Sequence, residues 1–90
     1  MKHEEIIIEL EGLAAQLSVK IRYEKGDFEG GYCVLKEEKV LLINKRLLPT
    51  RKAAILALAL NEIGLDNVFI KPALREYIED EVARTLRAAK

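Results

Sequence analysis

The hydrophobic residues near the start of the chain recur at the spacing of one helical face. The acidic residues of this segment come early, where a negative charge complements the helix dipole. We therefore predict an amphipathic helix over residues 3–17. Its apolar positions are Ile6, Ile7, Leu10, Leu13, Ala14 and Leu17.

The period of the pattern then changes, and three short segments follow that have the pattern of strands. Apolar and charged residues alternate over residues 19–24, which indicates a half-buried strand. A pair of glycines opens a second apolar run, residues 32–35, and the polar residues 37–39 separate it from a third run, residues 40–44. The third run is apolar on both faces, so we expect it to be the best-covered strand. Short strands joined by tight turns predict an antiparallel meander.

Two helices are predicted after the strands. Residues 50–64 begin beside Pro49, and a proline in the first turn of a helix leaves no donor unpaired there. Residues 53–60 are apolar around the whole circumference, so we expect neighbours on most sides of this helix. Residues 68–70 are expected to be extended and buried, and a last helix starts at Pro72. Its apolar stripe consists of Leu74, Ile78, Val82 and Leu86.

This order of elements predicts a single α+β domain over residues 1–90. Strands and helices that are segregated along the chain favour two packed layers. The expected architecture is therefore a two-layer α-β-β-β-α-α arrangement, with a three-stranded antiparallel meander packed on the central apolar helix.

Composition excludes several classes of partner. Fifteen basic and fifteen acidic residues cancel, so no net positive charge attracts nucleic acid or an anionic membrane surface. The longest apolar run has eight residues, which is too short to span a membrane. The single cysteine excludes an intrachain disulfide framework and fits a reducing compartment. The first residues are too acidic for a signal peptide, so we expect a cytoplasmic protein.

A short stretch at the end of the second predicted helix has the spacing of a zinc-protease motif without its zinc ligands. In an H-E-x-x-H helix, two histidines on one face hold the metal. Here Glu62 stands in the place of the glutamate, but Asn61 and Leu65 occupy the ligand positions. His3 is the only histidine and Cys33 the only thiol, so no alternative ligand set is available. We expect no metal, no cofactor and no peptidase activity.

The same stretch carries a resemblance to a known family. The order of elements over residues 3–65 is similar to the N-terminal part of the ImmA/IrrE family of zinc metallopeptidases, which places a helix and a strand meander before the H-E-x-x-H helix. The local matches are Leu42-Ile43-Asn44, Arg51-Lys52 and Glu62-Ile63-Gly64. The resemblance implies a metal-free module that binds a regulatory protein without cleaving it. The alternative is an unrelated apolar helix that ends in a glycine.

Glu62 is the first candidate for a buried polar site. It shares a helical face with Ile55 and Leu58, so we expect it to be partly buried. A buried carboxylate needs a partner, and the basic residues available are Arg22, Lys45 and Arg51. This structural role is favoured over a catalytic one. An enzyme that acts through Arg22, Glu62 and Lys45 is a third hypothesis.

A cluster of cations at the start of the central helix is the second candidate. Lys45, Arg46, Arg51 and Lys52 lie where positive charge opposes the helix dipole. Such a placement sometimes marks a site for an anion or an acidic partner. The alternative is a solvated corner between strand and helix.

Two further features have structural interpretations. The glycines of residues 26–31 allow close approach of a ligand, but a strand follows them, so a hairpin with a bulge is favoured over a binding loop. Cys33 lies within a strand, where we expect a small buried hydrophobe.

The leading functional hypothesis is a non-catalytic domain that acts through protein–protein contacts, in the first place with itself. Half of the residues are hydrophobic, which in so small a domain favours burial of apolar surface in a homodimer. Its last helix is the expected interaction surface. Nucleic acid, membrane and metal are excluded as partners.

Overall fold

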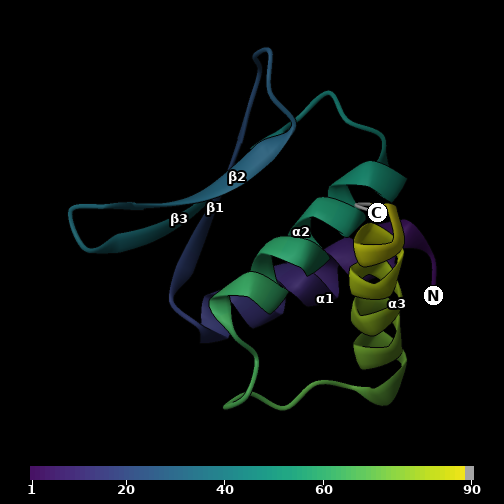
Figure 1. Ribbon diagram of the computed structural model, residues 1–90. Coiled ribbons are helices and arrows are strands. Elements are labelled where there is room, and N and C mark those ends of the chain that lie inside the picture. Colours follow the sequence, from purple (N-terminus) through teal and green to yellow (C-terminus); the bar gives the residue numbers. More distant parts are fainter. Residues whose placement is uncertain (89–90) are drawn as a thin grey trace.

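The structure, a computed structural model that describes residues 1–88, contains the six predicted elements in the predicted order. They are α1 (His3–Gln16), β1 (Val19–Glu24), β2 (Gly30–Leu35), β3 (Glu38–Asn44), α2 (Pro49–Ile63) and α3 (Pro72–Ala88). The helices gather on one side of the sheet, and α2 packs against both other helices and the sheet (Figure 1). The α+β class, the two layers and the central helix are therefore confirmed.

The sheet is mixed, and the prediction of a fully antiparallel meander is wrong for one of its two pairings. Strand β3 lies in the centre, in the order β1-β3-β2. Strand β2 is antiparallel to β3, with Tyr32 opposite Leu41, whereas β1 is parallel to β3, with Ile21 opposite Leu41. The chain crosses the end of β3 between β1 and β2, and the two edge strands never pair. The central position agrees with the expectation that β3 is the best-covered strand.

The buried side chain of Asn44 holds this crossing in place at the end of β3. Its Nδ2 donates to the carbonyl oxygens of Gly26 at 2.9 Å and Phe28 at 2.7 Å. Its Oδ1 accepts from the backbone N–H of Arg46 at 3.0 Å. The backbone N–H of Asn44 also donates to the carbonyl of Glu29 at 2.8 Å. One residue therefore ties the β1–β2 connection to the central strand.

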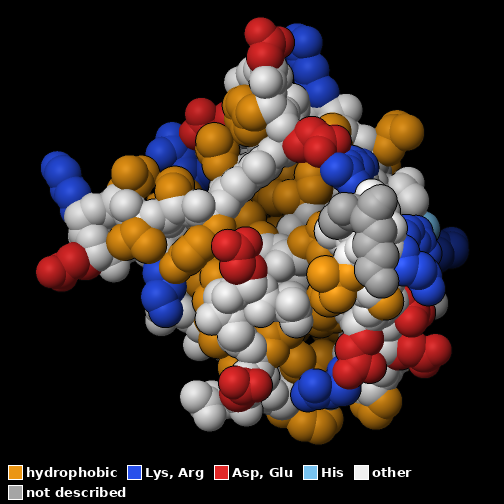
Figure 2. Space-filling model, in the orientation of Figure 1, with side chains coloured by type: hydrophobic (Ala, Val, Ile, Leu, Met, Phe, Trp, Pro, Cys, Tyr) orange, Lys and Arg blue, Asp and Glu red, His pale blue; other side chains and the backbone are white. Residues whose placement is uncertain are grey.

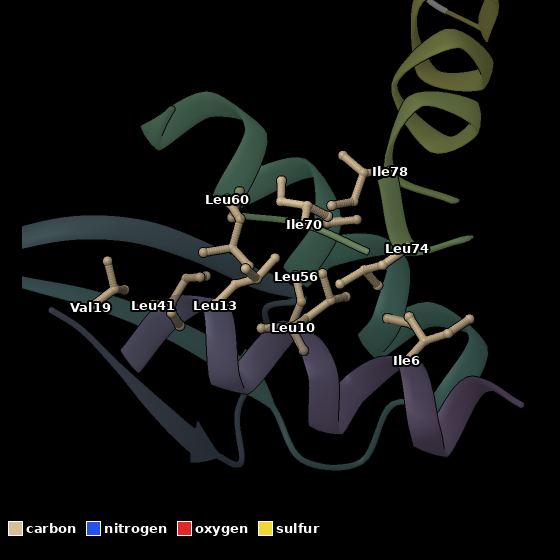
Figure 3. Close-up of a cluster of buried hydrophobic side chains, with 14 of the residues drawn as sticks. Ile6, Leu10, Leu13, Val19, Leu41, Leu56, Leu60, Ile70, Leu74 and Ile78 are labelled. Atoms are coloured by element: carbon tan, nitrogen blue, oxygen red, sulfur yellow. The ribbon is translucent and has the colours of Figure 1, made fainter. Parts of the chain in front are cut away.

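The core lies between α2 and its neighbours, as Figure 3 shows. Helix α2 contributes both large and small side chains to the core: Ala53 and Ala57 are as fully buried as Leu56 and Leu60. Alanines let the neighbouring helices approach closely, while each large side chain contributes about 1.5–3 kcal/mol on burial. The largest fully buried side chains are Leu10, Leu41, Ile43, Leu56, Leu60 and Leu74. The expectation that α2 has neighbours on most sides is thus confirmed.

Two connecting segments differ from their predictions. The segment 68–70 was expected to be buried, but the side chain of Phe69 is 80% exposed, whereas Ile70 is buried and Val68 packs partly against the core. The turn between β2 and β3 consists of Lys36 and Glu37 rather than residues 37–39, and both have positive φ, as a type I′ two-residue hairpin turn requires. The β2–β3 hairpin projects away from the helices (Figure 1). No helix in the part of the chain that the structure describes is long and apolar enough to cross a membrane.

Replacement of Asn44 tests whether its amide holds the crossing. We expect Asn44→Ala to lower the free energy of unfolding by about 1–3 kcal/mol, because two carbonyls and one N–H lose their hydrogen bonds to a buried amide. Chemical denaturation measures this change. The matched control is Asn67→Ala at an exposed asparagine, which should change stability by less than about 0.5 kcal/mol. Equal effects of the two substitutions would contradict the role of Asn44.

Candidate functional site

Glu62 lies on the surface at the end of α2, so the expectation that it is partly buried is wrong. Its helical face also carries Ile55 and Leu58, but both are only half-buried, so this face runs along the margin of the core. Arg51 stands eleven residues earlier on the same helix, which corresponds to about 16 Å along the axis. Glu62 is therefore not a buried charge that needs this partner.

Arg51 instead forms a two-pronged ion pair with Glu29 of the β1–β2 connection. The Nε of Arg51 donates to one carboxylate oxygen at 2.8 Å, and its Nη2 donates to the other at 2.6 Å. These hydrogen bonds hold the pKa of Glu29 below its ordinary value, and they raise the pKa of Arg51. Both side chains are about half exposed, so the pair contributes orientation more than stability. It joins the start of α2 to the crossing segment.

The other basic residues of the predicted site lie on different elements and do not gather in one place. Lys52 lies over the ring of Tyr23, with its Nζ 5.6 Å from the ring centroid. Arg22 points to the opposite face of the sheet from Tyr23, and its Nη2 lies 2.7 Å from Oε2 of Glu24 in an ion pair. Lys45 and Arg46 are exposed in the turn after β3. The structure therefore brings Arg51 and Lys52 to one end of α2 but does not assemble the predicted residues into one site.

The stretch with zinc-protease spacing does not lie on one helix. Helix α2 ends at Ile63, and Gly64 follows with φ of 112°, a conformation that favours glycine. Leu65 therefore lies beyond the helix and does not share a helical face with Asn61. Among residues 1–88 no group of three or more His, Cys, Asp or Glu side chains is placed to hold a metal ion.

A surface cleft of about 340 Å³ lies where the end of α2 meets α3. Its lining combines positively and negatively charged side chains with apolar ones, but Glu62 does not belong to it. The lining residues are Asn61, Gly64, Leu65, Asp66, Ile70, Arg75, Ile78 and Glu79. The two positions that would carry zinc ligands in a peptidase, Asn61 and Leu65, therefore both reach this cleft.

The glycine-rich segment between β1 and β2 is not the predicted bulged hairpin, because these strands do not pair. At Gly30 a Cβ atom would lie 2.7 Å from the carbonyl oxygen of Leu42 and 3.0 Å from Cγ2 of Ile55. A glycine there lets α2 approach the sheet closely. The segment thus has a packing role in this fold.

Strand β2 carries the feature that the sequence analysis missed. Cys33 was expected to be buried, but it is exposed, because it pairs with Val40 on the face of the sheet opposite to Leu41 and the core. Val34 and Leu35 beside it are 58% and 53% exposed. None of the residues 30–35 is charged, and we call this strand with its unpaired backbone the β2 edge. Its lack of charge, beside the alternating charges of β1, was a signal visible in the sequence.

Two tyrosines have contrasting hydroxyl environments. The hydroxyl of Tyr23 donates to Glu11, and burial, together with this carboxylate, raises the pKa of Tyr23. The hydroxyl oxygen of Tyr77 is buried without a hydrogen-bond partner among residues 1–88. Burial, and next the negative charge of Glu81, raise the pKa of Tyr77 to about 12. The ring of Tyr77 packs edge-on against His3, with centroids 6.4 Å apart.

Comparison with known proteins gave no relatives: no family model, no curated protein and no solved structure matches the chain.

The two tyrosines should respond in opposite ways to removal of the hydroxyl. We expect Tyr77→Phe to raise the free energy of unfolding by up to about 1 kcal/mol, because an unpaired buried hydroxyl is lost. Tyr23→Phe should lower it by about 1–2 kcal/mol, because a hydrogen bond to a carboxylate is lost. Denaturation at neutral pH measures both, and an equal loss in the two variants would contradict the assignment.

The same pair predicts the alkaline limit of stability. A raised pKa means that the folded state keeps the phenolic proton after the unfolded chain, with its ordinary value of about 10, has released it. Below pH about 10 both states keep the proton of Tyr77, and the free energy of unfolding does not change with this group. As the pH rises from about 10 towards about 12, only the unfolded chain releases the proton, so the free energy of unfolding falls. Tyr77→Phe should flatten this part of the pH–stability curve.

Proposed function

We propose that this chain is a non-catalytic protein-interaction domain that associates with a second copy of itself through the β2 edge. The observation that carries the proposal is a six-residue edge strand without a single charge, with Val34 and Leu35 exposed on its two faces. An unpaired edge is a template for another strand. We place the domain in the cytoplasm, where the exposed thiol of Cys33 stays reduced.

The contrast between the two edges of the sheet supports a specific role for β2. Strand β1 alternates apolar residues with Lys20, Arg22 and Glu24, and charges are a common device against edge pairing. Strand β2 has neither charge nor proline to prevent pairing. Figure 2 shows hydrophobic side chains along the projecting hairpin, with charged groups at its tip. One edge is thus protected and the other is open.

A second candidate function is a metal-free ImmA/IrrE-like module that binds a regulatory protein. The observation that favours it is the cleft of about 340 Å³ at Asn61 and Leu65, which combines apolar side chains with Arg75 and Glu79. In this function the cleft receives a segment of the partner rather than a substrate for hydrolysis.

Metal analysis tests the metal-free premise of this second candidate. Protein that is purified without chelator should contain no stoichiometric zinc, because asparagine and leucine stand at the ligand positions. One zinc per chain would contradict it.

Analytical ultracentrifugation tests the leading proposal. With rising concentration we expect the mass to increase from that of the 10.2 kDa chain towards twice this value. Replacement of Val34 and Leu35 together by lysine should keep the protein monomeric, because it puts two charges at the paired edge.

The control variant replaces Ile8 and Leu48 by lysine. These side chains are 67% and 73% exposed and lie outside β2, so the control adds the same charge elsewhere. It should dimerise like the unmodified protein. A strict monomer, or a dimer that only the control variant disrupts, would overturn the proposal.

A further inference from the structure

The backbone hydrogen bonds determine which groups β2 offers on its free side. The N–H of Asn44 donates to the carbonyl of Glu29, so position 29 faces β3. In an antiparallel pair the bonding direction alternates from one residue to the next. The groups that face β3 therefore belong to positions 29, 31, 33 and 35. The N–H and C=O groups of Gly30, Tyr32 and Val34 face away from β3 and are available to another strand.

Symmetry restricts how a second copy can pair with these groups. Two identical copies form a closed dimer about a two-fold axis. In an antiparallel pair of identical strands the two-fold axis is perpendicular to the sheet, so a given residue points to the same face in both copies. Directly opposed residues also share a face, and faces alternate along a strand, so opposed residues are an even number of positions apart. The axis must therefore pass through a residue that opposes its own copy, and near the middle of β2 that residue is Tyr32 or Cys33.

The side chains favour the register with Cys33 on the axis. In this register residues 31–35 of each copy pair with each other, and all of them are uncharged. Tyr32 then opposes Val34 of the second copy, an aromatic and β-branched pair of the kind that stabilises sheets. With Tyr32 on the axis, the exposed Leu35 would instead oppose Glu29 of the second copy. An apolar side chain would then face a carboxylate.

We infer that two copies of this chain form a continuous six-stranded sheet through antiparallel pairing of β2 with β2, with Cys33 opposite its own copy. This inference rests on the proposed function and adds the partner's register. The hairpin projects beyond the helices, so its edge is accessible to a second hairpin (Figures 1 and 2). Pairing of β1 of one copy with β2 of another would add copy after copy in an open-ended assembly. The charges of β1 disfavour this pairing.

The thiol of Cys33 provides a direct test of the register. In this register the two Cys33 residues form a non-hydrogen-bonded pair, whose Cα atoms lie about 4.5 Å apart, within the range of a disulfide. Incubation with oxidised glutathione should join the two chains through one disulfide. Each disulfide formed releases two protons and two electrons, which convert one oxidised glutathione into two thiols. With Tyr32 on the axis the Cys33 residues would be offset by two positions, beyond about 7 Å and too far to be joined.

Two cysteine variants separate the outcomes. Cys33→Ser with Tyr32→Cys should cross-link at least ten-fold more slowly than the unmodified chain; the reverse order would overturn the register and leave the self-association proposal standing. Cys33→Ser with Leu48→Cys controls for random collision, because position 48 is exposed and lies outside β2, at the start of α2. A rate for this control equal to that of Cys33 would also overturn the register. A monomer at every concentration would remove both the register and the proposed function.

A proline variant tests the bonding direction. Val34→Pro removes an N–H that faces away from β3, so the chain should fold and lose dimerisation. Cys33→Pro gives the opposite case: it removes an N–H that bonds β3 and should destabilise the monomer. Loss of the fold in Val34→Pro, by circular dichroism, with dimerisation retained in Cys33→Pro would overturn the assignment.

Discussion

The fold depends on the amide of Asn44 at the end of β3. Without it the chain that crosses from β1 to β2 would leave two carbonyl oxygens and the start of the next turn without partners. With it, β1 and β2 are held on opposite sides of β3, and the central strand is the one whose residues are apolar on both faces. The same crossing makes β2 an edge strand, so the backbone groups on its outer side are left without a neighbouring strand.

Packing on the helical side shows why the sheet is left open at β2. Alanines in α2 let α1 and α3 pack closely against α2, and the three helices enclose most of the apolar core. Gly30 allows α2 to touch the start of β2, but the rest of the strand runs out beyond the helices. The helices therefore protect one end of β2 and leave Val34 and Leu35 to solvent or to a partner.

Much of this architecture follows from the spacing of residues along the chain. Helical and strand periods predicted all six elements, because these periods are local properties of the backbone. Strand pairing is not local: the segment between β1 and β2 has the composition of a hairpin turn, and only the buried amide of Asn44 shows that it crosses the sheet. The burial of Cys33 was wrong for a related reason, since the run of residues does not show which face of the sheet the helices cover. Glu62 was misplaced for a similar reason, since a helical face identifies neighbours but not how deeply the core covers them.

The open β2 edge is the central feature of the account, and amide hydrogen exchange observes it directly. Exchange measured at increasing protein concentration should show growing protection of the amides of Tyr32 and Val34, with the exposed turn at Lys36 and Glu37 unchanged. That result would show that the free groups of β2 become hydrogen-bonded as copies associate. Fast exchange of both amides at concentrations where a dimer is present would contradict the account.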